Sequence, residues 1–358
     1  DEYPDAIVEQ LKELGLFGLT VKEEYGGAGL DLMTYALVVV ELARGWMSLS
    51  GVLNTHFMAC YMIDKFGTDD QKQRLLPRLA SGEIRASLSM SEPGAGSDVQ
   101  AITCKAIRDG ENYVVDGTKM WVTNGLRSGL VVLLVKTDPS TEPPYKGMSL
   151  LLVEKEPEAT EFEGIKIPPN IAKMGYKGVE TTELVFENHK VPAANLLGGE
   201  EGRGFQQVLD GIEVGRVNVS ARAVGVATRA FEEAIEYSQL RETFGKKISK
   251  HQAIQFMLAD MGTKLQAARL MLLSAAKKKV SGQRSDLEAG MAKLFCAEAC
   301  HQIVTDALRV HGGYGYSKEY TIERLYRDAP FLLIGEGTSE IQKLVISREL
   351  LERYKVQS

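Results

Sequence analysis

The order of hydrophobic patterns along the 358 residues is the feature that most limits the possible folds. A stretch with helical periodicity comes first, short β-rich runs follow, and helical periodicity then returns to the end of the chain. Strands and helices therefore do not alternate, which disfavours a doubly wound parallel sheet. We predict an α+β fold with a helical domain over 1–85, a small antiparallel β domain over 86–200 and a helical bundle over 201–358.

The opening stretch carries apolar residues at helical spacing. Ile7, Leu11 and Leu14 are separated by four and three residues, which places them on one face of a helix. The apolar run from Thr34 to Ala43 predicts a buried helix. The chain opens at Asp1 without an initiating Met, so we expect that its natural start is missing.

The central stretch contains short β-rich runs separated by turns. Asp109 and Gly110 stand between two such runs, and Asp-Gly is a strong signal for a hairpin turn. Nine of the 11 prolines fall between Pro77 and Pro192, which is typical of loops that join short strands. The runs that predict strands are Asn112 to Val115, Met120 to Thr123, Leu130 to Val135, Ser149 to Val153 and Leu184 to Phe186.

Two long helices are predicted in the last stretch. The first carries a stripe of apolar residues at alternating spacings of four and three, which indicates packing against other helices. The second ends at His311, because Gly312 and Gly313 follow and glycine commonly terminates helices. The stripe consists of Ile254, Leu258, Met261, Leu265, Ala268 and Leu272.

Composition excludes several classes of protein. Hydrophobic residues make up 44% and charged residues 25%, as in ordinary globular proteins, so disorder and coiled-coil rods are disfavoured. The net charge of −6 and the lack of a basic tail argue against nucleic acid as the partner. We find no run of 18 apolar residues and no signal peptide, so we expect no membrane span. The four cysteines form no CxxC pair and are expected to be reduced thiols.

The common cofactor and metal motifs are missing. The sequence has no GxGxxG, GxxxxGK[ST], HExxH or GxSxG pattern. Cys296 and Cys300 lie one helical turn apart beside His301, but zinc would need further ligands and His301 points elsewhere on the helix. We therefore predict buried core thiols and no metal. The run Lys277 to Lys279 predicts a solvated helix end.

Four glycine-marked segments carry the functional signal. They are 91–98, SEPGAGSD; 119–125, KMWVTNG; 241–246, RETFGK, with His251 and Gln252; and 311–315, HGGYG, with 335–342, GEGTSEIQ. In this order, from Leu14 to about Leu351, the chain resembles the acyl-CoA dehydrogenase family of flavoenzymes. The resemblance implies FAD as cofactor and a C-terminal four-helix bundle behind the helical and β domains. It also implies one more helix at the start of the chain.

In this resemblance the first two segments line the flavin. Ser91 would bond to the flavin ring and Ser97 would lie near the CoA portion of the substrate; the alternative is a tight loop in which Ser97 or Asp98 caps a helix. Trp121 and Thr123 alternate along a strand, so both side chains would face the flavin; the alternative is a tryptophan in the core. The implied cofactor contacts here are Leu88, Ser89, Met90, Ser91, Gly96, Ser97, Trp121, Val122 and Thr123.

The resemblance further implies that each FAD is shared with a neighbouring subunit. Arg241 offers a forked, permanently charged donor for its pyrophosphate. The family often has Gln at the position of Arg309, which leaves the contact of that residue open. Glu340 would contact the FAD phosphates through its backbone, because a carboxylate does not suit an anion. The implied contacts are Arg241, Thr243, Phe244, Gln252, Arg309, Gly312, Gly313, Thr338 and Glu340.

Glu336 is the candidate catalytic base. Gly335 and Gly337 flank it, and glycines permit unusual backbone angles and a close approach of substrate. The reaction removes an α-proton from a thioester, and a carboxylate sequestered from water would have its pKa raised towards neutrality, as that task requires. The alternative is a loop Glu that caps the next helix. The family adds that the backbone N–H of this residue helps to hold the thioester oxygen.

The substrate contacts implied by the family are Ser97, Glu213, Arg216 and Gly337. Some relatives carry the base on a helix of the C-terminal domain, but the residue before Arg216 is Gly215. This absence favours Glu336 as the base.

The leading hypothesis is an acyl-CoA dehydrogenase that makes a trans-2-enoyl-CoA and passes electrons to an electron-transferring flavoprotein. Alternatives are an acyl-CoA oxidase, or a flavoprotein of this fold repurposed to bind nucleic acid. We expect a homo-oligomer, as a tetramer built from two dimers. The expected location is the bacterial cytoplasm, with the mitochondrial matrix as the alternative.

Overall fold

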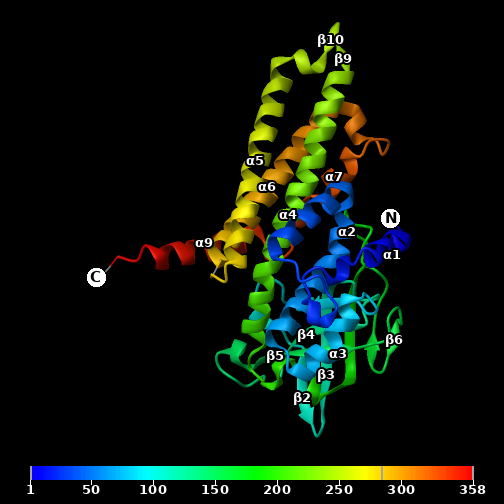
Figure 1. Cartoon of the computed structure of the whole chain (residues 1–358), viewed down its shortest axis with the longest axis vertical. Coiled ribbons are helices and arrows are strands. Elements are labelled where there is room, and N and C mark those ends of the chain that lie inside the picture. The colour runs from blue at the N-terminus through cyan, green and yellow to red at the C-terminus, as the bar shows by residue number, and fades with distance from the viewer. Residues whose placement is uncertain (1, 284, 357–358) are drawn as a thin grey trace. The chain divides into compact units, whose positions relative to one another are not determined.

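The computed structural model describes residues 2–283 and 285–356, which form two compact units (Figure 1). The units divide the chain at other places than the expected boundaries near 85 and 200, because two long helices each contribute residues to both units. The β unit takes in Asp1–Leu30, Gly51–Ala172 and Lys177–Ile212, and the helical unit takes in Asp31–Ser50, Lys173–Tyr176 and Glu213–Ser358.

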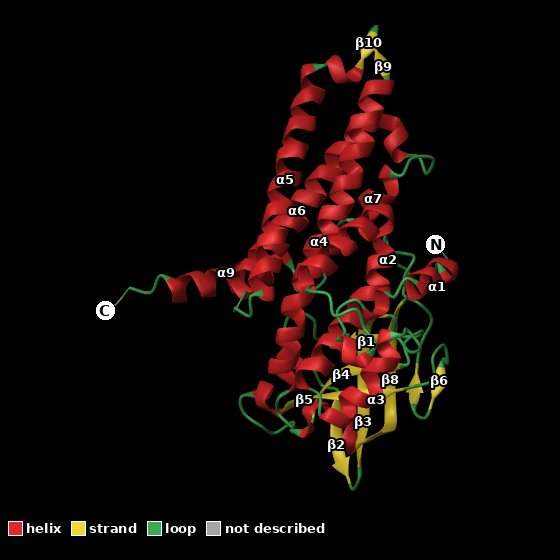
Figure 2. Ribbon diagram, in the orientation of Figure 1, coloured by secondary structure: helices red, strands yellow, loops and turns green. Residues whose placement is uncertain are grey.

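The strands of the β unit form a mixed sheet (Figure 2). Its strands are β1 (Ala86–Ser89), β2 (Lys105–Asp109), β3 (Asn112–Thr123), β4 (Leu130–Lys136), β5 (Met148–Glu154), β6 (Glu161–Phe162), β7 (Ile165–Lys166) and β8 (Thr181–Pro192). Most pairs are antiparallel, but β1 and β2 both pair with β4 in parallel. Most strand pairs of the predicted antiparallel β domain are thus antiparallel, and the two parallel pairs were not predicted. Composition predicts strands, whereas the direction of pairing depends on how the connections run.

The core of this sheet explains why the strands form where the sequence predicted them. Leu130 to Val135 of β4 are all fully buried, and so are Ser149 to Val153 of β5, which pair with Val135 to Val131. A strand buried on both faces reads as a continuous apolar run, which is the pattern of both segments. The hairpin between β2 and β3 is confirmed, with Gly110 at φ +58° in the turn. The two runs predicted at 112–115 and 120–123 are parts of the single strand β3.

Short helices complete the β unit. Helix α1 (Asp5–Glu13) buries Val8 and Leu11, while Ile7 and Leu14 are exposed, so the predicted apolar face is wrong by part of a turn. Helix α3 (Asp69–Ala80) begins with a capping box between Thr68 and Gln71, which satisfies two backbone donors at its start.

The predicted buried helix around 34–43 lies in α2 (Leu32–Phe66), which is interrupted at Trp46 by extended backbone angles. Tyr35, Ala36, Val39 and Ala43 are buried, as expected. By length and composition alone α2 could cross a membrane. The sequence shows no unbroken apolar run here, so this helix was not expected to pass that test. However, 61% of its most apolar window is buried inside the protein, as in a core helix.

The helical unit contains α5 (Gln252–Val280), α6 (Asp286–His311) and the part of α4 (Gly204–Leu240) that follows residue 212. These three helices run side by side in Figure 1. The remaining helices are α7 (Ile322–Asp328), α8 (Pro330–Ile334) and α9 (Ser339–Arg353), and a small hairpin joins β9 (Glu242–Thr243) to β10 (Lys246–Lys247). The predicted stripe of α5 is buried from Met261 to Leu272, and α6 ends at His311 as predicted. Cys296 and Cys300 are buried thiols.

Candidate active site

Glu336 lies in the short turn between α8 and α9. Its backbone has φ +55°, and Gly337 follows with φ +88°. A glutamate in the left-handed region is strained, and such a conformation persists where surrounding contacts hold it. Gly335, which precedes Glu336, packs closely against the ring of Phe331. A Cβ at this position would lie only 2.7 Å from Cζ of that ring. The Glu336 side chain is partly buried.

Two buried side chains bond to the carbonyls of this turn. The Nζ of Lys293, on α6, donates to the carbonyl oxygens of Gly337 at 2.7 Å and Leu333 at 3.3 Å. The Nε2 of Gln342, on α9, donates to the carbonyl oxygens of Glu336 at 3.2 Å and Gly337 at 3.1 Å. Sequence reasoning missed both residues, because a Lys and a Gln inside helical patterns carry no signal of their own.

An aromatic stack lies next to the turn. Tyr176 stacks on Phe331 with ring centroids 4.6 Å apart, and its hydroxyl accepts a hydrogen bond from Arg222 at 3.1 Å. Burial raises the pKa of Tyr176, and the negative charge of Glu336 adds to that effect. Arg222 is itself fully buried. These residues bring a segment near 176 beside a turn near 335, a contact that no local pattern predicts.

The start of α9 is capped by Thr338, whose hydroxyl accepts a hydrogen bond from the N–H of Ile341 at 3.3 Å. The hydroxyl expected near the FAD phosphates thus takes part in capping the helix. The N-cap residue of α9 is thus Thr338. Backbone and side-chain hydrogen bonds at this helix start lower the pKa of Glu340, whose side chain is exposed.

Glu213 and Arg216, the expected substrate pair, lie one turn apart on α4 and are both buried. Glu213 accepts hydrogen bonds from Lys279 at 2.6 Å and from the N–H of Ser285 at 3.1 Å. The prediction of a solvated helix end at 277–279 is therefore wrong for Lys279. Burial lowers the pKa of Arg216, and among the described residues its Nε has no hydrogen-bond partner. That atom is available to a ligand.

In the β unit, the expected flavin loop follows β1, which contains Leu88 and Ser89. The N–H of Met120 donates to the carbonyl of Ser91 at 2.8 Å, which ties the loop to β3. Ser89 is buried, and within the described part of the chain its Oγ lacks a hydrogen-bond partner. Gly96 and Ser97 are exposed.

A buried ion pair underlies this loop. The Nζ of Lys119, on β3, donates to the carbonyl of Met90 at 2.9 Å and to the carboxylate of Glu92 at 2.9 Å. Glu92 also accepts from the N–H of Thr103 at 2.7 Å and of Cys104 at 2.9 Å. Sequence reasoning named the surrounding segments but not this pair, because charged residues in a loop and on a strand are usually exposed.

Trp121 does not follow the regular alternation that was expected. The pairing of β3 with β8 shifts between Lys119 and Val122, and Trp121 has φ +63° in this bulge. Its side chain is 56% exposed, so the alternative of a core tryptophan is wrong. Val122 is buried and Thr123 is partly buried. A bulge re-aims side chains relative to a regular strand, and no sequence pattern marked it here.

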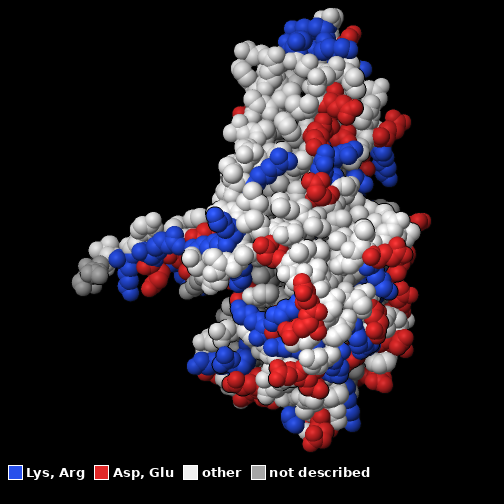
Figure 3. All heavy atoms as spheres, viewed as in Figure 1, with Lys and Arg blue, Asp and Glu red and all other residues white. Residues whose placement is uncertain are grey.

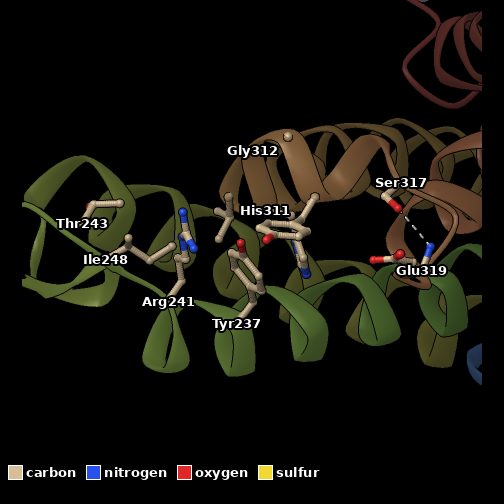
Figure 4. A pocket seen from close by; sticks show the side chains of 11 residues that line it. Tyr237, Arg241, Thr243, Ile248, His311, Gly312, Ser317 and Glu319 are labelled. Carbon is tan, nitrogen blue, oxygen red and sulfur yellow. Dashed lines mark hydrogen bonds between the residues drawn. The ribbon is translucent and has the colours of Figure 1, made fainter.

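A pocket of about 600 Å³ lies at the end of the helical unit (Figure 4). Tyr237 and Arg241 rise from α4 towards His311 and Gly312 at the end of α6. His311 stacks on Tyr237 at 4.3 Å and donates from Nδ1 to the carbonyl of Ala307 at 2.8 Å. Its Nε2 has no hydrogen-bond partner among the residues described.

Some of the expected FAD contacts line this pocket and others do not. Arg241, Thr243, Gly312 and Gly313 are lining residues. Phe244 is 96% exposed on the hairpin. Arg309 lies outside the lining and pairs with Asp306 at 3.1 Å. Gln252 is the first residue of α5 and is exposed. Basic side chains gather at this end of the helical unit (Figure 3), among them Lys246, Lys247 and Lys250.

These features fit the chemistry of FAD. A guanidinium suits a pyrophosphate, and the backbone at Gly312 and Gly313 is open, since a Cβ at either position would meet no atom within 4 Å. The buried, unpartnered Nε2 of His311 and Oγ of Ser89 are polar atoms that a ligand can satisfy. The residues expected to hold the cofactor thus offer donors, acceptors and space. Among the described residues, no cluster of His, Cys, Asp or Glu could hold a metal ion.

Comparisons with known proteins agree with this arrangement. Models of the acyl-CoA dehydrogenase N-terminal, middle and C-terminal domains match residues 1–83, 87–189 and 202–351. The chain is 40% identical to a 3-(aryl)acrylate reductase of Clostridium sporogenes, over 98% of the chain and 91% of that protein. It is 36% identical to a caffeyl-CoA reductase–Etf complex subunit of Acetobacterium woodii, over 98% of the chain and 91% of that protein.

A solved structure of an acyl-CoA dehydrogenase from Geobacillus kaustophilus is similar to this fold. The TM-score is 0.92 with 36% sequence identity, and the match covers 98% of this chain and 90% of that one. The predicted order of helical, β and helical parts is confirmed by this match. The chain belongs to the acyl-CoA dehydrogenase family of FAD-dependent oxidoreductases.

Proposed function

We propose that the chain catalyses α,β-dehydrogenation of an acyl-CoA thioester to a trans-2-enoyl-CoA, with Glu336 as the base. The single observation that carries this proposal is the turn of Glu336, where a carboxylate stands on left-handed backbone whose carbonyls are bonded to buried side chains. Such a turn presents the side chain in a fixed direction. A base that takes up a carbon-bound proton benefits from this placement.

In the proposed reaction the two C–H bonds at the α and β carbons break and a C=C bond forms. The α-proton moves to a carboxylate oxygen of Glu336, and the β-hydrogen leaves with its electron pair. Bound FAD supplies the acceptor for those two electrons. Arg216, whose Nε has no hydrogen-bond partner among the described residues, and Glu213, held by Lys279 and Ser285, would bind the substrate near this turn.

We infer that the electrons pass to an electron-transferring flavoprotein. The name of the Acetobacterium woodii relative places that protein in a complex with Etf, which supports such a partner. Both relatives named above are called reductases, and the same groups would catalyse the reverse reaction by returning a proton to the α-carbon. Reduction of an enoyl-CoA is therefore the second candidate function. We further propose that the chain forms a homo-oligomer in which Arg241 and Phe244 reach the FAD of a neighbour.

An anaerobic titration with a panel of thioesters tests this function. Butyryl-CoA, isobutyryl-CoA, octanoyl-CoA and 3-phenylpropionyl-CoA would each be added to the FAD-loaded protein while the flavin absorbance is followed. We expect at least one to bleach the flavin. Bleaching by none of them, together with oxidation of the dithionite-reduced flavin by the matching enoyl-CoA, would favour the reductase.

The first variant is Glu336→Gln, which keeps the size of the side chain but removes the base. We expect FAD to remain bound and flavin reduction to slow by at least about 100-fold. Glu352→Gln, which changes an exposed carboxylate further along α9, is the matched control and should reduce at the wild-type rate. Normal flavin reduction in Glu336→Gln would show that the base lies elsewhere.

A further inference from the structure

Lys293 is a buried cation directly behind the turn of Glu336. Its residue is 0% exposed, and its ammonium group donates to two carbonyl oxygens on either side of the turn, those of Leu333 and Gly337. Removing an ammonium group from water is unfavourable unless nearby groups accept its hydrogen bonds. The carbonyl oxygens of Leu333, in α8, and of Gly337, in the turn just before the N-cap of α9, provide these acceptors. Lys293 thus connects the last turn of α8 with the residue that follows Glu336.

Gln342 holds the same turn from α9. It is also 0% exposed, and its amide donates to the carbonyls of Glu336 and Gly337. The carbonyl of Gly337 therefore accepts from both Gln342 and Lys293. Because each peptide group is planar, fixing the carbonyls of Glu336 and Gly337 fixes two successive peptide planes. The Cβ of any residue other than glycine at 337 would lie 2.7 Å from Nε2 of Gln342, so the fit is close.

These contacts explain why strained backbone persists at this position. Glu336 has φ +55°, a conformation that non-glycine residues rarely adopt and that surrounding structure must enforce. Lys293 and Gln342 both bond to backbone carbonyl oxygens of this turn, so they hold the backbone that carries the glutamate side chain. Burial lowers the pKa of Lys293 to about 8, and the negative charge of Glu336 opposes that decrease. The lysine is therefore mostly charged at pH 7.

We propose that Lys293, together with Gln342, is a positioning residue that fixes the backbone of Glu336 and thereby aims its carboxylate at the α-carbon. The inference rests on the proposed role of Glu336 as the base. Lys293 acts through the turn and does not itself take up the proton. Its removal should therefore slow proton abstraction while leaving the binding of FAD and acyl-CoA intact.

The test compares Lys293→Met and Gln342→Met with wild type, all loaded with FAD. Stopped-flow flavin reduction would be measured anaerobically with saturating thioester, using the panel member that bleaches the wild-type flavin fastest. The affinity for the matching enoyl-CoA would come from the shift in the flavin spectrum. We expect the rate constant of Lys293→Met to fall by about 100-fold, the cost of a small misplacement of a reacting group, while that affinity changes by less than about threefold.

Lys155→Met is the matched control. Lys155 is 5% exposed, its Nζ donates to the carbonyls of Leu126 at 2.8 Å and Glu156 at 3.3 Å, and burial likewise lowers its pKa to about 8. It lies in the β unit and outside the sites described here. This variant removes the same kind of buried cation, so it reports any general effect of lost stability. We expect its reduction rate to remain within about twofold of wild type, because no reacting group is displaced.

Gln342→Met provides the second, milder variant and decides the question if Lys293→Met does not fold. It should show the same selective loss of rate. In the double variant the activation free energy of flavin reduction should rise by less than the sum of the two single increases, because both side chains hold one turn. Wild-type rates in the folded variants, or a loss confined to FAD or enoyl-CoA binding, would overturn the proposal. So would an equal loss in Lys155→Met. Normal reduction by Glu336→Gln would instead reject Glu336 as the base, the role on which this inference rests.

Discussion

At the scale of single residues, buried charge marks the functional parts of this chain. Arg222, Lys119 and Lys293 are among its largest fully buried side chains. Each is bonded to a carbonyl, a carboxylate or a tyrosine hydroxyl next to a segment expected to hold cofactor or substrate. A buried cation is costly when it lacks such partners, so its presence ties a loop firmly to the core. Sequence patterns usually assign these residue types to the surface.

His56 in the β unit leads to a prediction about pH. Its Nδ1 accepts from the N–H of Ala86 at 3.2 Å, so Nε2 carries the proton and donates to the carbonyl of Phe17 at 3.2 Å. Burial lowers the pKa of His56 to about 4 from the usual 6.5. Between these values the unfolded chain binds a proton that the folded protein does not, so stability falls as pH falls.

We therefore expect His56→Gln to be less sensitive to acid than wild type. The wild-type protein should lose about 2 kcal/mol of unfolding free energy through this group between pH 7.5 and pH 5, and the variant should not. Guanidinium unfolding of both proteins at the two pH values measures the difference. If the stability gap between them is the same at pH 7.5 and pH 5, His56 does not titrate as described.

At the scale of elements, a strand holds the loop that precedes it in the chain. Lys119 of β3 bonds to the carbonyl of Met90 and to the carboxylate of Glu92, 29 and 27 residues earlier. Burial alone would raise the pKa of Glu92, but Lys119 and the N–H groups of Thr103 and Cys104 lower it. The expected flavin loop is therefore held in place by the buried side chain of Lys119. This anchoring leaves the exposed side of the loop to a ligand.

Removing one charged member of this pair should lower the unfolding free energy more than removing both. Lys119→Met leaves the Glu92 carboxylate buried without its cation, and we expect a loss of about 3 kcal/mol in unfolding free energy. Adding Glu92→Gln should recover part of that loss, because the uncompensated charge disappears. Chemical denaturation of the FAD-free single and double variants measures the coupling, and FAD titration should show weaker binding by Lys119→Met. Strictly additive losses would contradict a direct pairing.

At the scale of the whole molecule, the pocket around Arg241 connects the proposed cofactor site with the proposed assembly. The guanidinium lies 5.7 Å from the ring centre of Tyr314, and the nearby Phe244 is almost fully exposed. A large exposed aromatic ring beside a cationic pocket is typical of a surface that another molecule covers. FAD held partly by a neighbouring chain would satisfy both features.

Arg241→Ala should lower both FAD occupancy and the size of the assembly. Loss of a charged donor should weaken FAD binding by about tenfold to a hundredfold. Light scattering after gel filtration, with the flavin-to-protein absorbance ratio, measures both quantities. Arg108→Ala is the control, since that guanidinium also lies over a tyrosine ring, at 5.4 Å from Tyr113, but on the hairpin of β2 and β3. Full FAD occupancy in an intact assembly of Arg241→Ala would count against a shared site.

Much of the fold could be read from the sequence, because periodicity reports burial directly. The strand at 130–135, the stripe on α5 and the end of α6 at His311 follow from local pattern and glycine chemistry. Three details could not be read in this way. They are the parallel pairing of β1 and β2 with β4, the bulge at Trp121 and the face that α1 buries. Each depends on which segment meets which, and not on local sequence.

The same division applies to the candidate site. The sequence by itself determined the family, the order of its parts and the glycine-flanked Glu336, because these are written in contiguous residues. Only the tertiary structure decided that Lys293 and Gln342 hold the turn of Glu336, that Lys119 and Glu92 support the loop after β1, and that Lys279 pairs with Glu213. The physical reason is that a buried polar side chain is stabilised by partners distant in sequence, and only folding brings those partners within hydrogen-bonding distance.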